Sequence, residues 1–157
     1  MIGRAGAWLL RKRTLMRAPI WVYRAHLGFL FGSRMLMLEH IGRKSGARRF
    51  VVLEVVGHPT PDVYVVASGF GDRSQWFRNV IAHPSVQVSV AGHRAHAAAA
   101  RRLPAAEADA ALADYAHRYP RAWVKFKGVL ENTLGTAISD RDTPLPMVEL
   151  RLDRPWS

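Results

Sequence analysis

Four basic residues and two glycines crowd into the eight-residue segment Gly42–Arg49, which lies between two apolar runs. A hydroxyl side chain, Ser45, stands among the four cations, which are Arg43, Lys44, Arg48 and Arg49. Arginine can bind two oxygens of one phosphate, lysine supplies a point charge, and glycine lets backbone N–H groups approach an anion. The segment therefore predicts a hairpin that binds phosphate, with a solvated hairpin tip as the alternative. It is not a Walker-type loop, because the spacing differs and no helix follows.

A second candidate site follows the apolar run 63–66, where small residues, Ala67, Ser68 and Gly69, precede a short helical segment that carries Trp76 and Asn79. Small residues at the end of a strand allow a flat ring to approach the backbone, and Trp76 would form a wall beside it. The alternative is an ordinary loop with Trp76 in the core, where tryptophan is commonly found.

Several kinds of active site are excluded by residue type. The chain has no cysteine, which rules out disulfides, thiolate metal sites and a cysteine nucleophile. His93 and His96 are three residues apart on a predicted strand, so they face opposite sides and cannot bind one metal. No carboxylate pair or serine elbow has a useful spacing, and no metal site is expected. We expect a cofactor to carry the reactivity instead.

The positive charge is concentrated at the front of the chain. The net charge is +11, and residues 1–49 contribute eleven Lys and Arg against one acid, Glu39. Residues 5–31 alternate arginines with Trp, Phe and Leu, which predicts amphipathic helices that either lie on an anionic membrane or pack on the rest of the protein. They resemble neither a secretory signal nor a membrane span. We expect this arm to cover residues 1–34 and one cofactor-binding domain to cover residues 35–157.

From residue 35 the pattern changes to short strands with inserted helices. An antiparallel meander opens the domain, and the segment 58–62 is expected to end its second strand. The predicted strands are 35–41, 49–56, 63–68, 86–90, 94–102 and 147–152; the predicted helices are 74–82, 104–118 and 121–134, and the predicted loop is 132–146. Six strands with helices between the later ones indicate an α+β, mainly β fold built on a small antiparallel barrel.

Three of these segments, 38–46, 65–69 and 76–86, resemble the deazaflavin-dependent nitroreductase family in residue type, order and spacing. The resemblance covers residues 18–152. It implies a six-stranded split β-barrel of the flavin-reductase-like superfamily, with homodimers in related branches. It also implies coenzyme F-420, an 8-hydroxy-5-deazaflavin, as the hydride donor to quinones, nitroaromatics or similar activated acceptors.

The resemblance also implies roles for individual residues. Arg43, Lys44, Ser45 and Arg49 fall where the family binds the phosphate and acidic tail of the cofactor, and Arg48 replaces a common proline. Ala67, Ser68 and Gly69 fall beside the ring, with Trp76 and Asn79 in the adjoining helix. Tyr119 falls over the acceptor, so Tyr119 and Ser68 are the candidate catalytic residues; a helix-terminal Tyr119 packed on the barrel is the alternative.

The acceptor and the partners are less closely specified by the pattern. Trp123 and Phe126 stand where well-studied members have further tyrosines. The basic arm makes a membrane quinone such as menaquinone an attractive acceptor, reached from the cytoplasm by peripheral contact with the inner face of the cell membrane. The alternatives are an FMN-binding split-barrel oxidoreductase, a non-catalytic deazaflavin carrier, and a nucleic-acid-binding protein. The last is disfavoured, because no strand face interleaves basic and aromatic residues.

Overall fold

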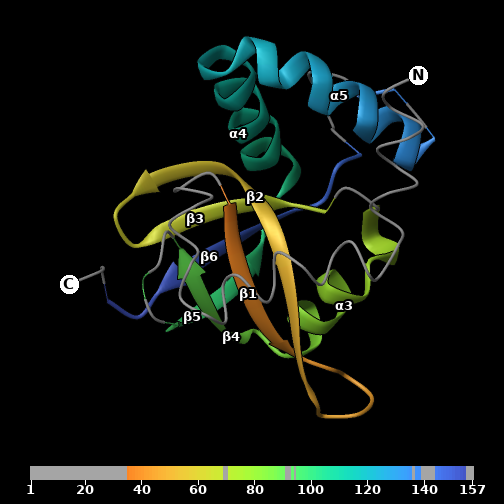
Figure 1. The fold of residues 1–157 in the computed structure, drawn as a ribbon. Coiled ribbons are helices and arrows are strands. Elements are labelled where there is room, and N and C mark those ends of the chain that lie inside the picture. Colours follow the sequence, from red (N-terminus) through yellow and green to blue (C-terminus); the bar gives the residue numbers. More distant parts are fainter. Residues whose placement is uncertain are drawn as a thin grey trace.

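Six antiparallel strands close into a barrel in the order β1-β2-β3-β6-β5-β4 (Figure 1). The computed structural model describes residues 35–68, 71–90, 93, 95–135, 137–138 and 144–154. The strands are β1 (Met35–Ile41), β2 (Arg48–Thr60), β3 (Val63–Ala67), β4 (Ser85–Val90), β5 (His96–Arg102) and β6 (Met147–Leu152). The helices are the 3-10 helix η2 (Gly71–Arg73) and α3 (Gln75–Ala82), α4 (Ala105–Arg118) and α5 (Pro120–Leu134). The barrel confirms the predicted fold, and the predicted arm lies outside the described residues.

Alternate strand residues fill the barrel, as the two-residue period of a strand requires. Leu38 of β1, for example, lies opposite Val51 of β2 and Val88 of β4, and all three are buried. Burying such a side chain contributes about 1.5–3 kcal/mol. The helix α3 packs against β1 and β5 and adds three side chains to this interior cluster: Trp76, Phe77 and Val80. Its position next to β1 later brings α3 to the basic hairpin.

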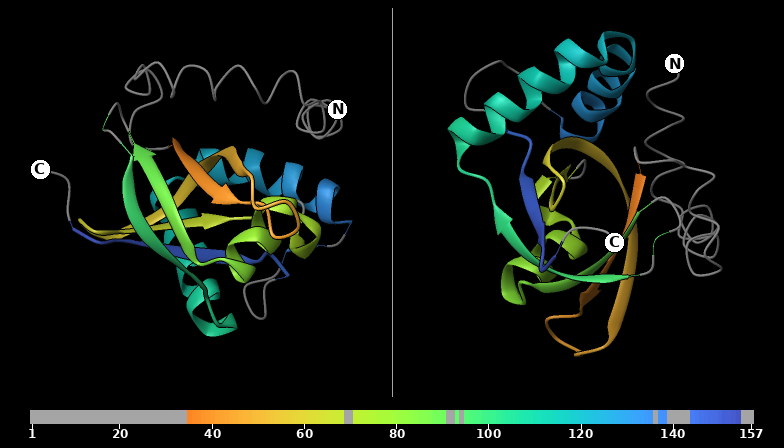
Figure 2. Two further views of the ribbon diagram at one scale, coloured as in Figure 1. Left: turned by 90° about the horizontal axis from the view of Figure 1, so that it is seen from below. Right: turned by 90° about the vertical axis from the view of Figure 1, so that its left-hand side faces the viewer.

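The helices α4 and α5 cover part of the outside of the barrel (Figure 2). Buried residues of α4 recur at helical spacing, at Ala108, Leu112 and Tyr115. They form a second cluster with outward-facing residues of the sheet, among them Val65 and Met147. The helix pair and the β1–β2 hairpin lie at opposite ends of the molecule, as Figure 1 and the right panel of Figure 2 show.

The strand β2 is longer than predicted, because the segment 58–62 does not end it. The strand runs to Thr60, which pairs with Val63 across the next turn. The register shifts between Gly57 and Thr60, and such an irregularity tolerates Pro59, which has no N–H to donate. His58 also holds this end in place, because its ring stacks on the Tyr64 ring with centroids 4.1 Å apart.

The remaining differences are at the ends of elements. Ser74 is the N-cap of α3 rather than its first residue, and Pro104 is likewise the N-cap of α4. The helix α5 begins at Pro120, one residue earlier than predicted, and ends before Gly135, whose φ of 74° is favourable for glycine. The described part of β5 begins at His96 rather than at residue 94. These shifts of one or two residues leave the predicted topology unchanged.

Candidate functional site

The tip of the β1–β2 hairpin is a tight turn held by its own backbone. The N–H of Gly42 donates to the carbonyl of Ala47 at 2.9 Å, and the N–H of Gly46 donates to the carbonyl of Gly42 at 2.8 Å. Gly46 has a φ of 70°, a conformation that L residues with a side chain rarely adopt. At Gly42 an added Cβ would lie 2.6 Å from Oγ of Ser45, so the hydroxyl occupies the space a side chain would need.

The two arginines that begin β2 point to opposite sides of the sheet. Arg48 pairs with Ile41 on the outer face, where its Nε donates to the carboxylate of Glu39. This hydrogen bond and the carboxylate charge raise the pKa of Arg48 above its ordinary value. Arg49 instead pairs with His40, which shares the inward face of β1 with Leu38. Arg49 therefore lies on the α3 side of the hairpin, and Arg48 is already neutralised on the other side.

The helix α3 is tied to the hairpin by the side chain of Asn79. Its Oδ1 accepts two hydrogen bonds from Arg43, one from the backbone N–H at 3.1 Å and one from Nη1 at 2.9 Å. Its Nδ2 lies 3.1 Å from Nδ1 of His40. Asn79 is only 5% exposed and His40 only 4% exposed, so these polar groups satisfy one another away from water.

His40 is neutral at ordinary pH. Burial, and to a smaller extent the positive charge of Arg49 across the strand pair, together lower its pKa to about 4. A neutral imidazole has one nitrogen that can accept a hydrogen bond, which a protonated ring does not have. The role of His40 was not predicted from the sequence, since it depends on α3 folding back beside β1.

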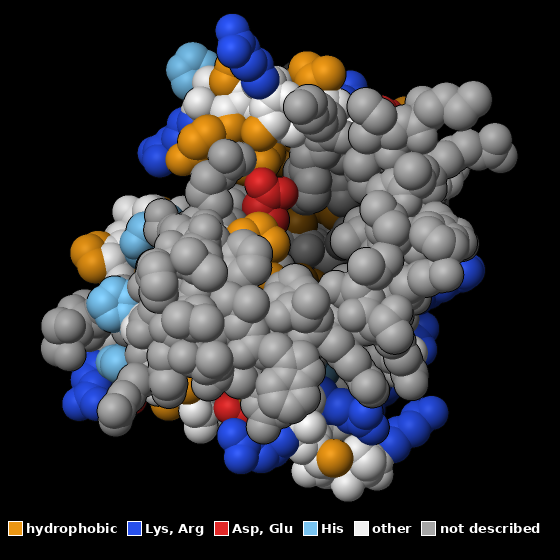
Figure 3. All heavy atoms as spheres, in the orientation of Figure 1, with side chains coloured by type: hydrophobic (Ala, Val, Ile, Leu, Met, Phe, Trp, Pro, Cys, Tyr) orange, Lys and Arg blue, Asp and Glu red, His pale blue; other side chains and the backbone are white. Residues whose placement is uncertain are grey.

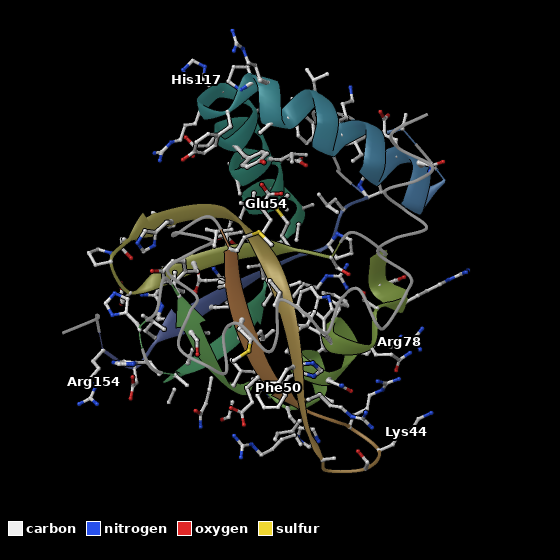
Figure 4. The ribbon with its side chains drawn as sticks, in the orientation of Figure 1. Lys44, Phe50, Glu54, Arg78, His117 and Arg154 are labelled. Atoms are coloured by element: carbon white, nitrogen blue, oxygen red, sulfur yellow. The ribbon has the colours of Figure 1, made fainter. Side chains whose placement is uncertain are left out.

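Basic side chains extend from the hairpin along the neighbouring edge of α3. In Figure 4, Lys44 projects from the tip and Arg78 projects from α3 on the same side of the molecule. Nε of Arg78 donates to the carbonyl of Asp72 at 3.1 Å, which holds the stem of this exposed side chain near the start of α3. Figure 3 shows Lys and Arg side chains gathered around this lower right rim. Arg78 was not among the predicted site residues, although it is the neighbour of Asn79 in the sequence.

The second predicted cluster lies where β3 ends. Ser68 is fully buried; its N–H donates to the carbonyl of Pro146 at 2.8 Å, and its Oγ donates to the carbonyl of Gly71 at 2.5 Å. Ala67 packs against the cluster beneath α4, and Trp76 is 7% exposed within the barrel core. Gly69 lies outside the described residues. The N–H and the hydroxyl of Ser68 are therefore both used in hydrogen bonds within the protein.

Tyr119 joins α4 to α5 and is 41% exposed. Its ring centroid lies 5.6 Å from that of Tyr115, which in turn lies 6.3 Å from that of Trp123. The hydroxyl of Tyr115 donates to Oε1 of Glu54 at 2.8 Å, which connects α4 to the outside of β2. Figure 4 shows Glu54 beneath α4, at the end of the barrel opposite Lys44. The catalytic candidate Tyr119 thus belongs to an aromatic group that is separate from the basic hairpin.

A cavity of about 350 Å³ lies between the start of α4 and the residues that precede β6. Its walls include Arg102, Leu103, Pro146 and Met147. Ala67 pairs with Met147 in the sheet, so the cavity neighbours the end of β3. Within the described residues no group of three His, Asp or Glu could hold a metal ion, and no helix is long and apolar enough to cross a membrane.

Comparison with known proteins matches the sequence to one family. The model of the family described as F420H(2)-dependent quinone reductase matches residues 15–136. No curated protein matches the sequence.

Solved structures share the fold at low sequence identity. An F420-H2 dependent reductase, FDR-A, is 20% identical with a TM-score of 0.52, over 75% of this chain and 94% of that chain. A structure described as a domain-swapped dimer is also 20% identical, with a TM-score of 0.53 over 76% and 81% of the two chains. The heme storage protein HutZ from Vibrio cholerae is 14% identical, with a TM-score of 0.52 over 80% and 86%.

Proposed function

Since the chain belongs to the F420H(2)-dependent quinone reductase family, we propose that it uses reduced coenzyme F-420 to reduce a quinone. The observation that supports this best is the basic hairpin. Arg43 donates to Asn79 of α3, and Arg49 shares the inward face with His40. Lys44 projects from the tip, while Arg48 is paired with Glu39. The resemblance of three separate sequence motifs to deazaflavin-dependent reductases supports the same function. A nitroaromatic acceptor is the second candidate for the substrate.

The donor groups of the hairpin fit a phosphate with an acidic tail. Guanidinium groups can bind two phosphate oxygens, and Lys44 at the exposed tip adds a third positive charge. Placing three cations beside one another costs repulsion, which a polyanion would relieve. We propose that Arg43, Lys44, Ser45 and Arg49 bind this anionic part. Arg48 makes no direct contact with this anionic part in the proposal, because its guanidinium is already paired with Glu39 on the outer face.

Bound coenzyme F-420 supplies the hydride, and the chain orients the reactants. We propose that the hydrogen bonds of Ser68 to Gly71 and Pro146 shape the end of β3 so that a flat ring can approach the backbone at Ala67. Trp76 supports this region from within the barrel core, where it forms an edge-to-face contact with Phe77 at 6.0 Å. Tyr119 would donate a proton or a hydrogen bond to the reduced acceptor. The main contributions of the protein are then orientation and exclusion of water.

The partners of the protein remain part of this proposal. A membrane quinone such as menaquinone is the expected acceptor, approached from the cytoplasm through peripheral contact of the arm, residues 1–34, with anionic lipid. Co-sedimentation with anionic vesicles at low salt tests this contact, and a protein that stays in the supernatant contradicts it. A homodimer is proposed as well, and sedimentation velocity would distinguish it from a monomer.

The test of the cofactor site is a triple variant that replaces Arg43, Lys44 and Arg49 with glutamine. Binding of oxidised and reduced coenzyme F-420 is followed by tryptophan fluorescence at two salt concentrations. We expect the affinity to fall by at least about 100-fold, because charge-assisted hydrogen bonds contribute about 1.5–3 kcal/mol each. The matched control removes three cations that lie outside the hairpin and α3: Arg101, Arg118 and Arg151. Unchanged affinity in the hairpin variant contradicts the proposed site.

Two further experiments on the purified protein distinguish the proposed function from two alternatives, an FMN enzyme and a non-catalytic carrier. FMN titrated in parallel would bind more tightly than the deazaflavin if the barrel were an FMN enzyme. Steady-state oxidation of the reduced cofactor by a menaquinone analogue separates an enzyme from a non-catalytic carrier, which would bind the cofactor without turnover.

A further inference from the structure

Three side chains from three elements meet in a chain of hydrogen bonds that ends at the basic hairpin. His40 comes from β1, Asn79 from α3 and Arg43 from the turn that follows β1. Their contacts are 3.1 Å between His40 and Asn79, and 3.1 and 2.9 Å between Asn79 and the two donors of Arg43. Asn79 is 39 positions from His40 and 36 positions from Arg43 in the sequence, so these contacts exist only in the folded protein.

The chemistry of these groups permits one arrangement of hydrogens. The backbone N–H and guanidinium of Arg43 can only donate, so the Asn79 atom that faces them must be its oxygen. The amide nitrogen of Asn79 then faces His40 and donates. Nδ1 of His40 must therefore be the unprotonated acceptor, and the ring proton must sit on Nε2. Reversing the amide would place N–H groups against Arg43 and break both bonds.

We propose that His40 is a positioning residue: by accepting from Asn79 it fixes the direction of that amide and thereby holds Arg43 in place for an anionic ligand. This inference rests on the proposed function for the identity of the ligand, coenzyme F-420. Nη1 of Arg43 is held by Asn79, while Nε and Nη2 make no hydrogen bond to a described residue and are available for phosphate oxygens. The histidine acts on the ligand only through Asn79 and Arg43.

The surroundings of His40 favour its neutral form. Arg49 faces it from β2, and Arg43 lies beyond the Asn79 amide. The helix α3 presents the uncharged Asn79, while Arg78 projects into solvent (Figure 4). The strand β4, the other neighbour of β1, holds no charged residue. Burial and the charge of Arg49 lower the pKa of His40 to about 4, so the acceptor nitrogen is preserved as long as the pH stays well above 4.

The test compares His40→Leu with His40→Asn. Leucine keeps an apolar volume but has no acceptor, whereas the amide oxygen of asparagine can take the place of Nδ1. We expect His40→Leu to weaken coenzyme F-420 binding by about 3- to 10-fold, with unchanged kcat at saturating cofactor, and His40→Asn to restore the affinity. As the pH falls toward 4, binding by the wild-type protein should weaken relative to His40→Asn, which cannot titrate in this range. Equal affinities of the leucine and asparagine variants would overturn the proposal.

A second measurement needs no ligand. Long-range ¹H–¹⁵N spectra of the wild-type protein should show His40 protonated on Nε2 only, and a proton on Nδ1 would overturn the proposal. The amide of Arg43 should exchange slowly in the wild type and in His40→Asn but faster in His40→Leu, because that N–H donates to Asn79. A wild-type protein that passes both tests but does not bind coenzyme F-420 would contradict the proposed function and leave the positioning role of His40 intact.

Discussion

Separate replacement of Arg49 and Arg48 by glutamine distinguishes two neighbouring cations by the face on which they lie. Both residues are exposed, both belong to the start of β2, and both substitutions remove one positive charge. Arg49 shares a face with His40 on the α3 side of the hairpin, whereas Arg48 donates to Glu39 on the outer face. If the anionic ligand lies along α3, only Arg49 can contact it directly.

The expected magnitude follows from the contact that each residue can make. A charge-assisted hydrogen bond to phosphate contributes about 1.5–3 kcal/mol, which corresponds to about a 10- to 150-fold loss of affinity for Arg49→Gln. Arg48→Gln removes a charge that Glu39 already neutralises and that water screens, so its effect on affinity should be much smaller.

The assay is titration of each variant with coenzyme F-420, followed by tryptophan fluorescence at low and at physiological salt. The salt dependence of binding should become weaker in Arg49→Gln and stay close to wild type in Arg48→Gln, because only the first loses a direct ion contact. Equal losses in both variants, or a larger loss in Arg48→Gln, would refute the assignment of the ligand to the α3 side.

Three further changes test other parts of the structure. Tyr119→Phe should lower turnover but leave cofactor affinity unchanged, and unchanged turnover removes this hydroxyl from the mechanism. Gly42→Ala should displace the Ser45 hydroxyl, which an added Cβ would meet at 2.6 Å, and weaken cofactor binding with little loss of stability by urea unfolding. Between pH 6.5 and about 4 the unfolded chain should bind a proton at His40 that the folded chain does not, so the free energy of unfolding should decrease as the pH is lowered. His40→Asn should make this decrease less steep, and an identical slope in the variant and the wild type would contradict it.

The barrel could be predicted because its strands carry their own signals. Val86, Val88 and Val90 alternate with polar residues, and the run 147–152 has turn-forming residues before it. Those patterns depend only on neighbours in the chain. The extension of β2 past Pro59 could not be predicted, since it depends on pairing with β3 and on the stacking of His58 on Tyr64.

The candidate site was predictable as a set of residues but not as a geometry. The concentration of charge in 42–49 is visible in the sequence, and the alternation of a strand could have shown that Arg48 and Arg49 face opposite sides. The contact of Asn79 with Arg43 and His40 could not be predicted, because it requires α3 to pack beside β1. Arg78 was missed for the same reason.

The structure also changes the electrostatic argument for a ligand at the hairpin. Charge counted along the sequence gives four cations on one turn, but Glu39 neutralises Arg48 on the outer face. Asn79 holds Arg43 by an uncharged oxygen, which orients the guanidinium without cancelling its charge. The Asn79 amide donates in turn to His40, which is buried and neutral. Neither Asn79 nor His40 therefore carries a negative charge that would compete with an anionic ligand for Arg43. The hairpin is therefore organised to direct positive charge toward α3, which is the side where a bound anion would lie.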